Sequence, residues 1–263
     1  MTLAPLDLSL LLPAFLAGLL VLATHVPMGI QVLARGIVFI DLAVAQIAGL
    51  GVIAADRMGF DPQGWAVQLF AVSAALAGAA ILTFTEKRWP DVQEALIGTL
   101  FVLAASGGAL LLADNPHGGE HLKDLLVGQI LWVTPSQLLP VALLTALLLV
   151  AWGRWRERLG SFGFYGLFAF AVTASVQLVG IYLVFASLVI PALATRHYSL
   201  RQRLPAAYLL GGASYSAGLV FSTWFDLPPG AVIVWTIALL GTLFYWAGPD
   251  SGNPLLSAHP EQD

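Results

Sequence analysis

The residue in this sequence best suited to chemistry is Asp41, the only charged side chain well inside a long apolar stretch. A carboxylate inside a bilayer costs several kcal/mol unless it faces a cavity or a partner, so it marks a functional site by default. We expect Asp41 to line a pathway for an ion, with a structural hydrogen bond to a neighbouring helix as the alternative. At about 100° per residue, Val44, Ala45 and Ala48 share its helical face, and Gln46 points about 140° away. A regular helix therefore places no second ligand beside Asp41.

A second pattern, His117-Gly118-Gly119-Glu120-His121, matches the H-x-x-E-H signature of some zinc proteases. That chemistry needs both histidines on one face of a helix. The preceding Asn115-Pro116 and the internal Gly-Gly pair make a helix there improbable. We therefore expect a solvated loop. The alternatives are weak metal binding, contact with a delivering protein, or an intramembrane metalloprotease.

The remaining titratable residues suggest less chemistry. His25 precedes Pro27 in an apolar run, where we expect a packed, neutral histidine, with a pore-lining role as the alternative. Glu86, Glu94 and the charged residues between them have the composition of a solvated loop at a span end. The sequence has no cysteine, no G-x-x-x-x-G-K-[ST] phosphate loop and no G-x-S-x-G nucleophile elbow. We therefore predict that the chain is not an enzyme and cannot hydrolyse ATP through a phosphate loop.

The composition identifies the elements that must position these residues. Of 263 residues, 59% are apolar and 10% are charged, against roughly a quarter charged in soluble domains. Apolar runs of about 20 residues, enough to cross a bilayer, recur along the chain. We predict an all-α integral membrane protein, with residues 1–263 forming a single transmembrane domain. The candidate spans are Leu8–Ile30, Ile37–Ala55, Trp65–Phe84, Ala95–Ala113, Gln137–Trp152, Phe164–Val179, Ile181–Thr195, Leu204–Ser222 and Gly230–Trp246.

Two features leave the number of spans at about eight or nine. The segment 121–133 is too short to cross a bilayer and is expected to be a half-helix or a re-entrant piece. The two spans around Gly180 could instead form one broken helix.

Basic residues predict the orientation, because Lys and Arg in short loops stay on the cytoplasmic side. With nine spans the N-terminus lies outside and the C-terminus inside, and only Arg57 and Lys123 fall outside. The nine inside are Arg35, Lys87, Arg88, Arg154, Arg156, Arg158, Arg196, Arg201 and Arg203. They form no cluster that could follow a phosphate backbone, and the net charge is −4, so nucleic acid is not an expected partner.

Four stretches together resemble the permease subunits of the zinc, manganese and iron importers of the ATP-binding-cassette superfamily. They are mostly apolar, and each is weak alone, but they occur in the family's order. The stretches are Arg35–Asp41, Glu94–Phe101 followed by Leu125–Leu131, Val179–Ala192 and Asp226–Val234.

The resemblance implies an importer permease fold in a bacterial inner membrane. It implies a dimeric pore, with a homodimer expected, two cytoplasmic ATPase subunits that use the ATP, and an extracytoplasmic metal-binding protein that delivers the cargo. This chain itself would bind no cofactor, and membrane lipid would surround it. Coupling to the ATPase would run through a short cytoplasmic helix, which by position resembles 154–162, with Arg154, Arg156, Glu157 and Arg158 as the contact residues.

The sequence departs from the family at the predicted metal site. Where the family usually has a pore histidine about four residues after the aspartate, this chain has Ala45, followed by Gln46. We therefore take Asp41 and Gln46 as the candidate metal residues. Asp41 from two subunits could hold a hard divalent cation with carboxylate and water oxygens. A metal chelate or another small solute, and a secondary transporter driven by an ion gradient, are the alternatives.

Overall fold

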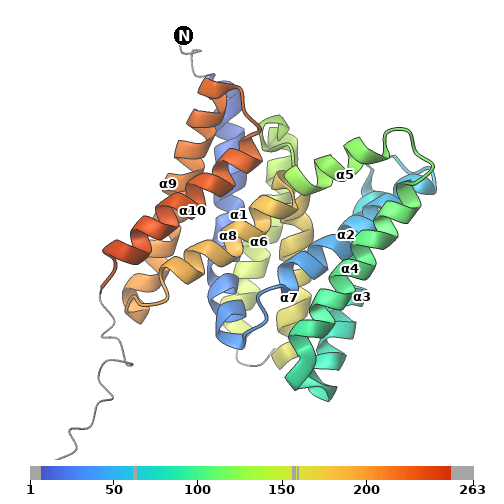
Figure 1. Cartoon of the computed structure of the whole chain (residues 1–263), viewed down its shortest axis with the longest axis horizontal. Coiled ribbons are helices and arrows are strands. Elements are labelled where there is room, and N and C mark those ends of the chain that lie inside the picture. Colours follow the sequence, from blue (N-terminus) through green and yellow to red (C-terminus); the bar gives the residue numbers. More distant parts are fainter. Residues whose placement is uncertain (1–6, 62–63, 156–157, 159, 250–263) are drawn as a thin grey trace, which may run out of the picture.

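The computed structural model describes residues 7–61, 64–155, 158 and 160–249, and in these ranges it contains helices and no strands. Figure 1 shows the helices as one tilted bundle. The α-helices are α1 (Leu8–Arg35), α2 (Ile40–Arg57), α3 (Trp65–Arg88), α4 (Gln93–Leu112), α5 (Gly118–Val127), α6 (Pro135–Trp155), α7 (Gly160–Val179), α8 (Ile181–Ala194), α9 (Leu200–Phe225) and α10 (Pro229–Ala247). Two 3₁₀ turns, η1 (Pro90–Val92) and η2 (Ile130–Trp132), complete the described part.

Seven of these helices are long and apolar enough to cross a membrane: α1, α3, α4 with η1, α6, α7, α9 and α10. The other two predicted spans correspond to α2 and α8. Helix α2 is 18 residues long but carries Asp41, Asp56 and Arg57, whereas α8 has only 14 residues. At 1.5 Å per residue α8 rises about 21 Å, less than the hydrocarbon core of a bilayer. The prediction of an all-α membrane protein is confirmed.

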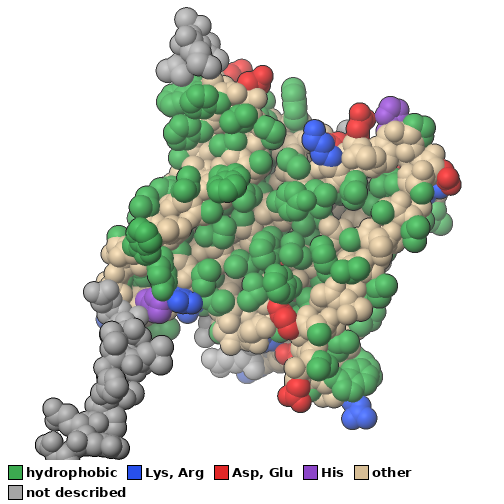
Figure 2. Space-filling view, viewed as in Figure 1, with side chains coloured by type: hydrophobic (Ala, Val, Ile, Leu, Met, Phe, Trp, Pro, Cys, Tyr) green, Lys and Arg blue, Asp and Glu red, His purple; other side chains and the backbone are tan. Residues whose placement is uncertain are grey.

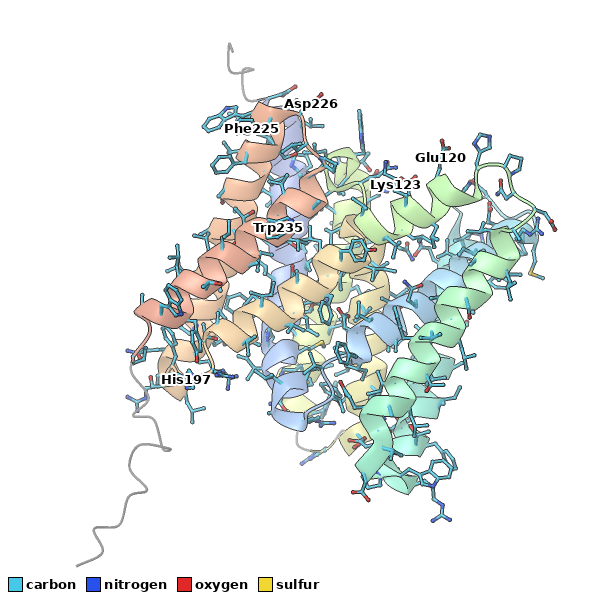
Figure 3. All side chains as sticks on the ribbon, in the orientation of Figure 1. Glu120, Lys123, His197, Phe225, Asp226 and Trp235 are labelled. Carbon is cyan, nitrogen blue, oxygen red and sulfur yellow. The ribbon has the colours of Figure 1, made fainter. Side chains whose placement is uncertain are left out.

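The first and the last described helix end at opposite ends of the bundle, as an odd number of spans requires. In Figure 1 α1 begins at the top and α10 ends at the lower left. Figure 3 places Glu120, Lys123 and Asp226 at the upper end and His197 at the lower end. Figure 2 shows a wide apolar surface between the charged side chains of the two ends. This arrangement is the one expected for a bilayer-spanning protein whose lower end carries most of the basic loops.

Capping residues define the two ends of α1. Oδ1 of Asp7 accepts hydrogen bonds from the backbone N of Ser9 at 2.9 Å and from its Oγ at 2.6 Å. These bonds lower the pKa of the Asp7 carboxyl, since they stabilise its charged form. At the other end Gly36 adopts a left-handed conformation with φ 71° and ψ 23°. This residue ends α1 and turns the chain toward α2.

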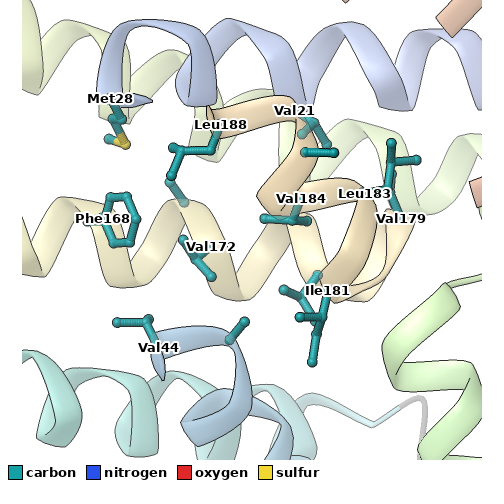
Figure 4. Packing of buried hydrophobic residues seen from close by; sticks show 14 of the residues in the cluster. Val21, Met28, Val44, Phe168, Val172, Val179, Ile181, Leu183, Val184 and Leu188 are labelled. Carbon is teal, nitrogen blue, oxygen red and sulfur yellow. The ribbon is translucent and has the colours of Figure 1, made fainter. Parts of the chain in front are cut away.

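The core lies where α1, α7 and α8 meet. Figure 4 shows Met28 of α1, Phe168 of α7 and Leu188 of α8 gathered there, and all three are buried. Gly29 makes the close approach possible, because a Cβ at this position would overlap the carbonyl oxygen of Leu188. Small residues that let helix backbones approach closely are the usual basis of packing in membranes.

The segment predicted as a half-helix is α5 followed by η2, and it lies across the upper part of the bundle (Figure 1). Three glycines fix it to the spans. A Cβ on Gly128 would overlap the carbonyl group of Val179, and one on Gly180 would overlap the backbone of Val127 and Gly128. A Cβ on Gly230, at the start of α10, would overlap the carbonyl oxygen of Val127. We call this backbone crossing the glycine junction.

The glycine junction also decides how the chain passes from α7 to α8. Gly180 has φ 81° and ψ 163°, a conformation that is almost exclusive to glycine. Helix α7 ends at Val179 and α8 begins at Ile181 in a new direction (Figure 1). The chain therefore forms two helices of different direction here, but α8 is shorter than a membrane span, so nine full spans are not found among the described residues.

Candidate functional site

Asp41 lies in the first turn of α2 and is completely buried, with 0% of its surface exposed. Neither carboxylate oxygen has a hydrogen-bond partner among the described residues, so the alternative of a structural hydrogen bond to a neighbouring helix is not found in this part of the chain. The N-terminal end of a helix favours negative charge by about 0.3–1 kcal/mol, which offsets only part of the cost of burying a carboxylate. Within the described part of the chain, Asp41 is therefore a buried acid with no hydrogen-bond partner.

The chain just before Asp41 is held by residues from two distant helices. Oε1 of Glu94, in the first turn of α4, accepts a hydrogen bond from the backbone N of Phe39 at 3.3 Å. The ring of Phe39 stacks on Phe185 of α8, with centroids 6.5 Å apart. Figure 1 shows that α2 begins nearer the middle of the bundle than the lower ends of α3 and α4. Asp41, in the first turn of α2, is therefore buried within the bundle.

This use of Glu94 differs from the expectation that residues 86–94 form a solvated loop. Besides the Glu94 contact, Oε1 of Glu86 lies 4.0 Å from Nη1 of Arg35, and the Arg35 guanidinium lies 4.2 Å from the centre of the Phe164 ring. The composition of this segment gave no signal for these contacts, because each one joins helices far apart in the sequence.

The face of α2 that carries Asp41 is apolar and buried, as helical geometry predicted. Val44, Ala45 and Ala48 have exposures between 0% and 2%. Figure 4 shows Val44 on the side of α2 that faces Val172 of α7. Gln46 is also buried, although the helical period places it on another face of α2. No group of three His, Cys, Asp or Glu side chains able to hold a metal occurs in the described ranges.

The H-x-x-E-H segment is helical, and the expectation of a loop there was wrong. Oδ1 of Asn115 accepts a hydrogen bond from the backbone N of His117 at 2.9 Å. The carbonyl oxygen of His117 accepts from the backbone N of Glu120 at 3.0 Å and of His121 at 3.1 Å. The Asn-Pro pair therefore precedes α5 and its cap residue His117, where proline interrupts none of the hydrogen bonds of the helix.

This helix still provides no zinc-protease site. His117 precedes α5 as its cap residue, whereas Glu120 and His121 lie in its first turn. Nδ1 of His117 lies 3.2 Å from Oε2 of Glu120, and both side chains are more than 70% exposed. These residues belong to no three-ligand group among the described residues. An exposed ion pair of this kind contributes little to stability.

The predicted coupling stretch, 154–162, contains no separate helix in its described part. Arg154 lies in the last turn of α6, and the backbone N of Arg158 donates to the carbonyl oxygen of Trp155 at 2.7 Å. Phe162 lies in the first turn of α7. Arg156 and Glu157 are outside the described residues. The coupling role of this stretch stays a prediction.

His25, for which we expected simple packing, is buried, and only one of its two ring nitrogens has hydrogen-bond partners among the described residues. Its Nδ1 lies 3.0 Å from the carbonyl oxygen of Val21 and 3.0 Å from Oγ1 of Thr24. Its Nε2 has no partner among the described residues. His25 and Asp41 are on α1 and α2, and the apolar layer of α7 and α8 described above packs against both helices.

Comparisons with known proteins identify the family. The sequence matches the ABC 3 transport family over residues 7–159 and 155–247. The chain belongs to this family. It is 26% identical over 273 residues to the manganese transport system membrane protein MntC of Halalkalibacterium halodurans, covering 94% of this chain and 90% of MntC. The resemblance noted in the sequence is confirmed, and the chain is a multi-pass protein of the bacterial inner membrane.

Solved structures have the same fold. PsaBC from Streptococcus pneumoniae in complex with Fab superposes with a TM-score of 0.75 at 21% identity, covering 94% of this chain and 95% of that one. An inward-facing metal-chelate type ABC transporter superposes with a TM-score of 0.68 at 18% identity, covering 89% and 85%. The family consists of transport proteins, which agrees with the prediction that this chain is not an enzyme.

Proposed function

We propose that this chain is the membrane-spanning permease subunit of an ATP-binding-cassette importer for a divalent metal ion, zinc, manganese or iron. Two permease chains, expected to be identical, would form the pore. Separate cytoplasmic ATPase subunits would supply the energy, and an extracytoplasmic metal-binding protein would deliver the cargo. The family match and the likeness to a manganese transport protein support this proposal.

The observation that carries the proposal is the unpartnered carboxylate of Asp41. A buried acid with no internal partner is costly to maintain, and a passing cation would supply the missing opposite charge. Because α2 holds only one such acid, the rest of the coordination shell must come from water, from Asp41 of a second chain, or from groups carried by the cargo. Carboxylate and water oxygens suit a hard cation better than soft zinc coordination by histidine.

Burial also constrains how cargo reaches this carboxylate. Asp41 is closed to solvent in a single chain, so a cation reaches it only after one of the helices packed against α2 moves away from it. A site shared by two Asp41 carboxylates needs the same rearrangement, since neither side chain lies on the surface. This requirement fits a transporter that alternates between conformations, with the change driven by the partner ATPase.

Metal uptake by cells tests the proposal directly. Cells lacking the chain should grow poorly and contain little metal when one of zinc, manganese or iron is limiting, and the wild-type gene should restore both. Asp41→Asn should fail to restore uptake while still assembling with the ATPase, because the amide keeps the shape but loses the charge. Asp56→Asn, which removes the same charge from the last turn of the same helix, should restore uptake as the wild type does.

The results separate the proposal from its alternatives. Normal uptake by Asp41→Asn would remove this residue from the pathway. Absence of any metal defect, together with a defect in uptake of a metal chelate, would favour chelate cargo, for which the chelator supplies ligands that α2 lacks. Transport by vesicles that contain only this chain would contradict dependence on a separate ATPase and would favour a secondary transporter.

A further inference from the structure

An open groove of about 530 Å³ lies between the beginning of α9 and the end of α10. It is at the lower end of the bundle in Figure 3, near His197, where the basic loops predict the cytoplasmic surface of the membrane. Its walls include Tyr198, Arg201, Gln202, Pro205, Leu209 and Ala247. The site is distant in sequence from Asp41, and none of the roles proposed above uses it.

The wall formed by α9 changes from polar to apolar along the helix. Arg201, Pro205 and Leu209 follow each other at intervals of four residues and therefore lie on one face. Arg201 is in the first turn, at the end of the helix, and Leu209 lies two turns further into the span with 66% of its surface exposed. This order, charge at the membrane surface and apolar surface below it, matches the order of headgroup and acyl chain in a phospholipid.

Arg201 is the arginine of this region that is available to a ligand. Arg196 donates from Nη2 to the hydroxyl of Tyr245 at 3.1 Å and from Nε to Nε2 of His197 at 2.9 Å. Arg203 donates from Nη2 to the carbonyl oxygen of Ala192 at 3.3 Å. Arg201 has no such contact with any described residue, and none of the described side chains that line the groove is acidic. Among the described residues, the groove therefore presents one positive charge that no acidic lining side chain compensates.

The opposite wall is held in place without a ligand. The hydroxyl of Tyr198 donates to the carbonyl oxygen of Phe244 near the end of α10 at 3.0 Å. The ring of Tyr198 also packs against Gly248, since a Cβ at Gly248 would meet it at 2.7 Å. A preformed wall lowers the ordering cost of binding.

We propose that this groove binds one anionic phospholipid of the cytoplasmic leaflet. The phosphate group lies at Arg201, and an acyl chain follows Pro205 and Leu209 into the bilayer. Basic pockets at the cytoplasmic ends of transmembrane helices are typical binding sites for acidic lipid headgroups. A protein partner would need a matching acidic and apolar surface, whereas an acidic membrane lipid supplies both features.

Phosphatidylglycerol and phosphatidylcholine with the same acyl chains are suitable probes, and retained lipid is counted by native mass spectrometry. The full chain, purified in a neutral detergent, should retain one more phosphatidylglycerol than phosphatidylcholine. Arg201→Gln should weaken this binding about fivefold, the effect of one arginine near an acidic lipid surface. Arg88→Gln removes an equal charge from the end of α3 and should leave it unchanged. Equal retention of the two lipids, or equal losses in the two variants, would overturn the proposal.

The absence of cysteine in the sequence allows a second test that locates the lipid. A single Gln202→Cys substitution places a thiol in the groove, and phosphatidylglycerol should slow its alkylation while phosphatidylcholine should not. Adding Arg201→Gln should raise the concentration of phosphatidylglycerol needed for protection about fivefold. A disulfide between two Cys-bearing chains, or protection by the ATPase without acidic lipid, would show that a protein covers the groove and would overturn the lipid assignment. Neither test depends on transport.

Discussion

A Gly180→Ala substitution tests the glycine junction most directly. Two costs add at this position. Alanine is strained at φ 81° and ψ 163°, which costs of order 1–3 kcal/mol. The new methyl group also overlaps the backbone of Val127 and Gly128, and because backbone yields less than a flexible side chain, overpacking should cost a further 1–3 kcal/mol or so. We expect the free energy of unfolding to fall by about 2–6 kcal/mol.

Gly36→Ala is the matched control. Gly36 also has a positive φ, 71°, but no atom lies within 4 Å of a Cβ built there. Only the conformational cost applies, about 1–2 kcal/mol. The difference between the two variants contains the steric part of the Gly180 effect together with the larger strain of its conformation at ψ 163°. Gly128→Ala should resemble Gly180→Ala, and the double variant should lose less than the sum of both, since the two methyl groups disturb the same crossing.

Reversible unfolding in mixed micelles, followed by the loss of helical circular dichroism, provides the measurement. Gly180→Ala should unfold at a clearly lower denaturant fraction than Gly36→Ala. Equal destabilisation of the two variants would refute it, because the backbones of Gly128 and Gly180 would then not be in contact. Strict additivity of the Gly128 and Gly180 substitutions would lead to the same conclusion.

Three further predictions concern the polar contacts of the bundle. Glu94→Ala should destabilise the chain by about 1 kcal/mol, as the loss of a helix cap does, and should reduce metal uptake. Glu94→Gln retains an acceptor for the N–H of Phe39, so it should change stability little in the same unfolding assay. Tyr215→Phe should cost about 0.5–1.5 kcal/mol in that assay, because it removes the buried hydrogen bond of 2.9 Å to Oγ of Ser187, and no loss of stability would contradict this. Changing Arg154 and Arg158 together to Glu should preserve folding but uncouple ATP hydrolysis from uptake in the reconstituted complex, and unchanged coupling would place the ATPase contact elsewhere.

The spans could be predicted because one physical requirement dominates their sequences. Inside a bilayer every backbone polar group must be paired within the segment, so a long apolar stretch has essentially one structure available, the helix. The predicted boundaries at Trp65, Val179 and Ile181 coincide with the observed helix ends. The half-helix was equally predictable, since the segment was too short to span and lay between two apolar runs.

The contacts that position Asp41 could not be predicted in this way. Glu94 lies 55 residues from Phe39, and nothing in either local sequence indicates that they meet. The same holds for the glycine junction, where Gly128 and Gly180 approach through the tertiary fold. The error at α5 had a local cause. Asn115-Pro116 would break a helix that contained it but is compatible with a helix that begins after it, and the sequence did not indicate which applied.

For the candidate site itself, the sequence predicted that no second ligand lies beside Asp41 on α2, but it did not predict the chemistry of the site. The helical period correctly placed Asp41 on an apolar face with Val44 and Ala45, which are buried beside it. The sequence could not determine which groups complete a coordination shell. Ligands contributed by a second chain, by water or by the cargo leave no periodic signal in this sequence.

Helix α8 connects the glycine junction to the candidate site. It begins at Gly180, where the junction fixes it to α5, and only five residues later Phe185 stacks on Phe39, two residues before Asp41. Four intervening residues span little more than one helical turn, so α8 cannot absorb a displacement of α5 along this length by bending. In a transporter that admits cargo to Asp41, the contact between Phe39 and Phe185 must therefore change whenever α5 moves with the start of α8. A substitution at Gly180 should consequently alter uptake through Asp41 as well as stability, although Gly180 offers no side chain to a cation.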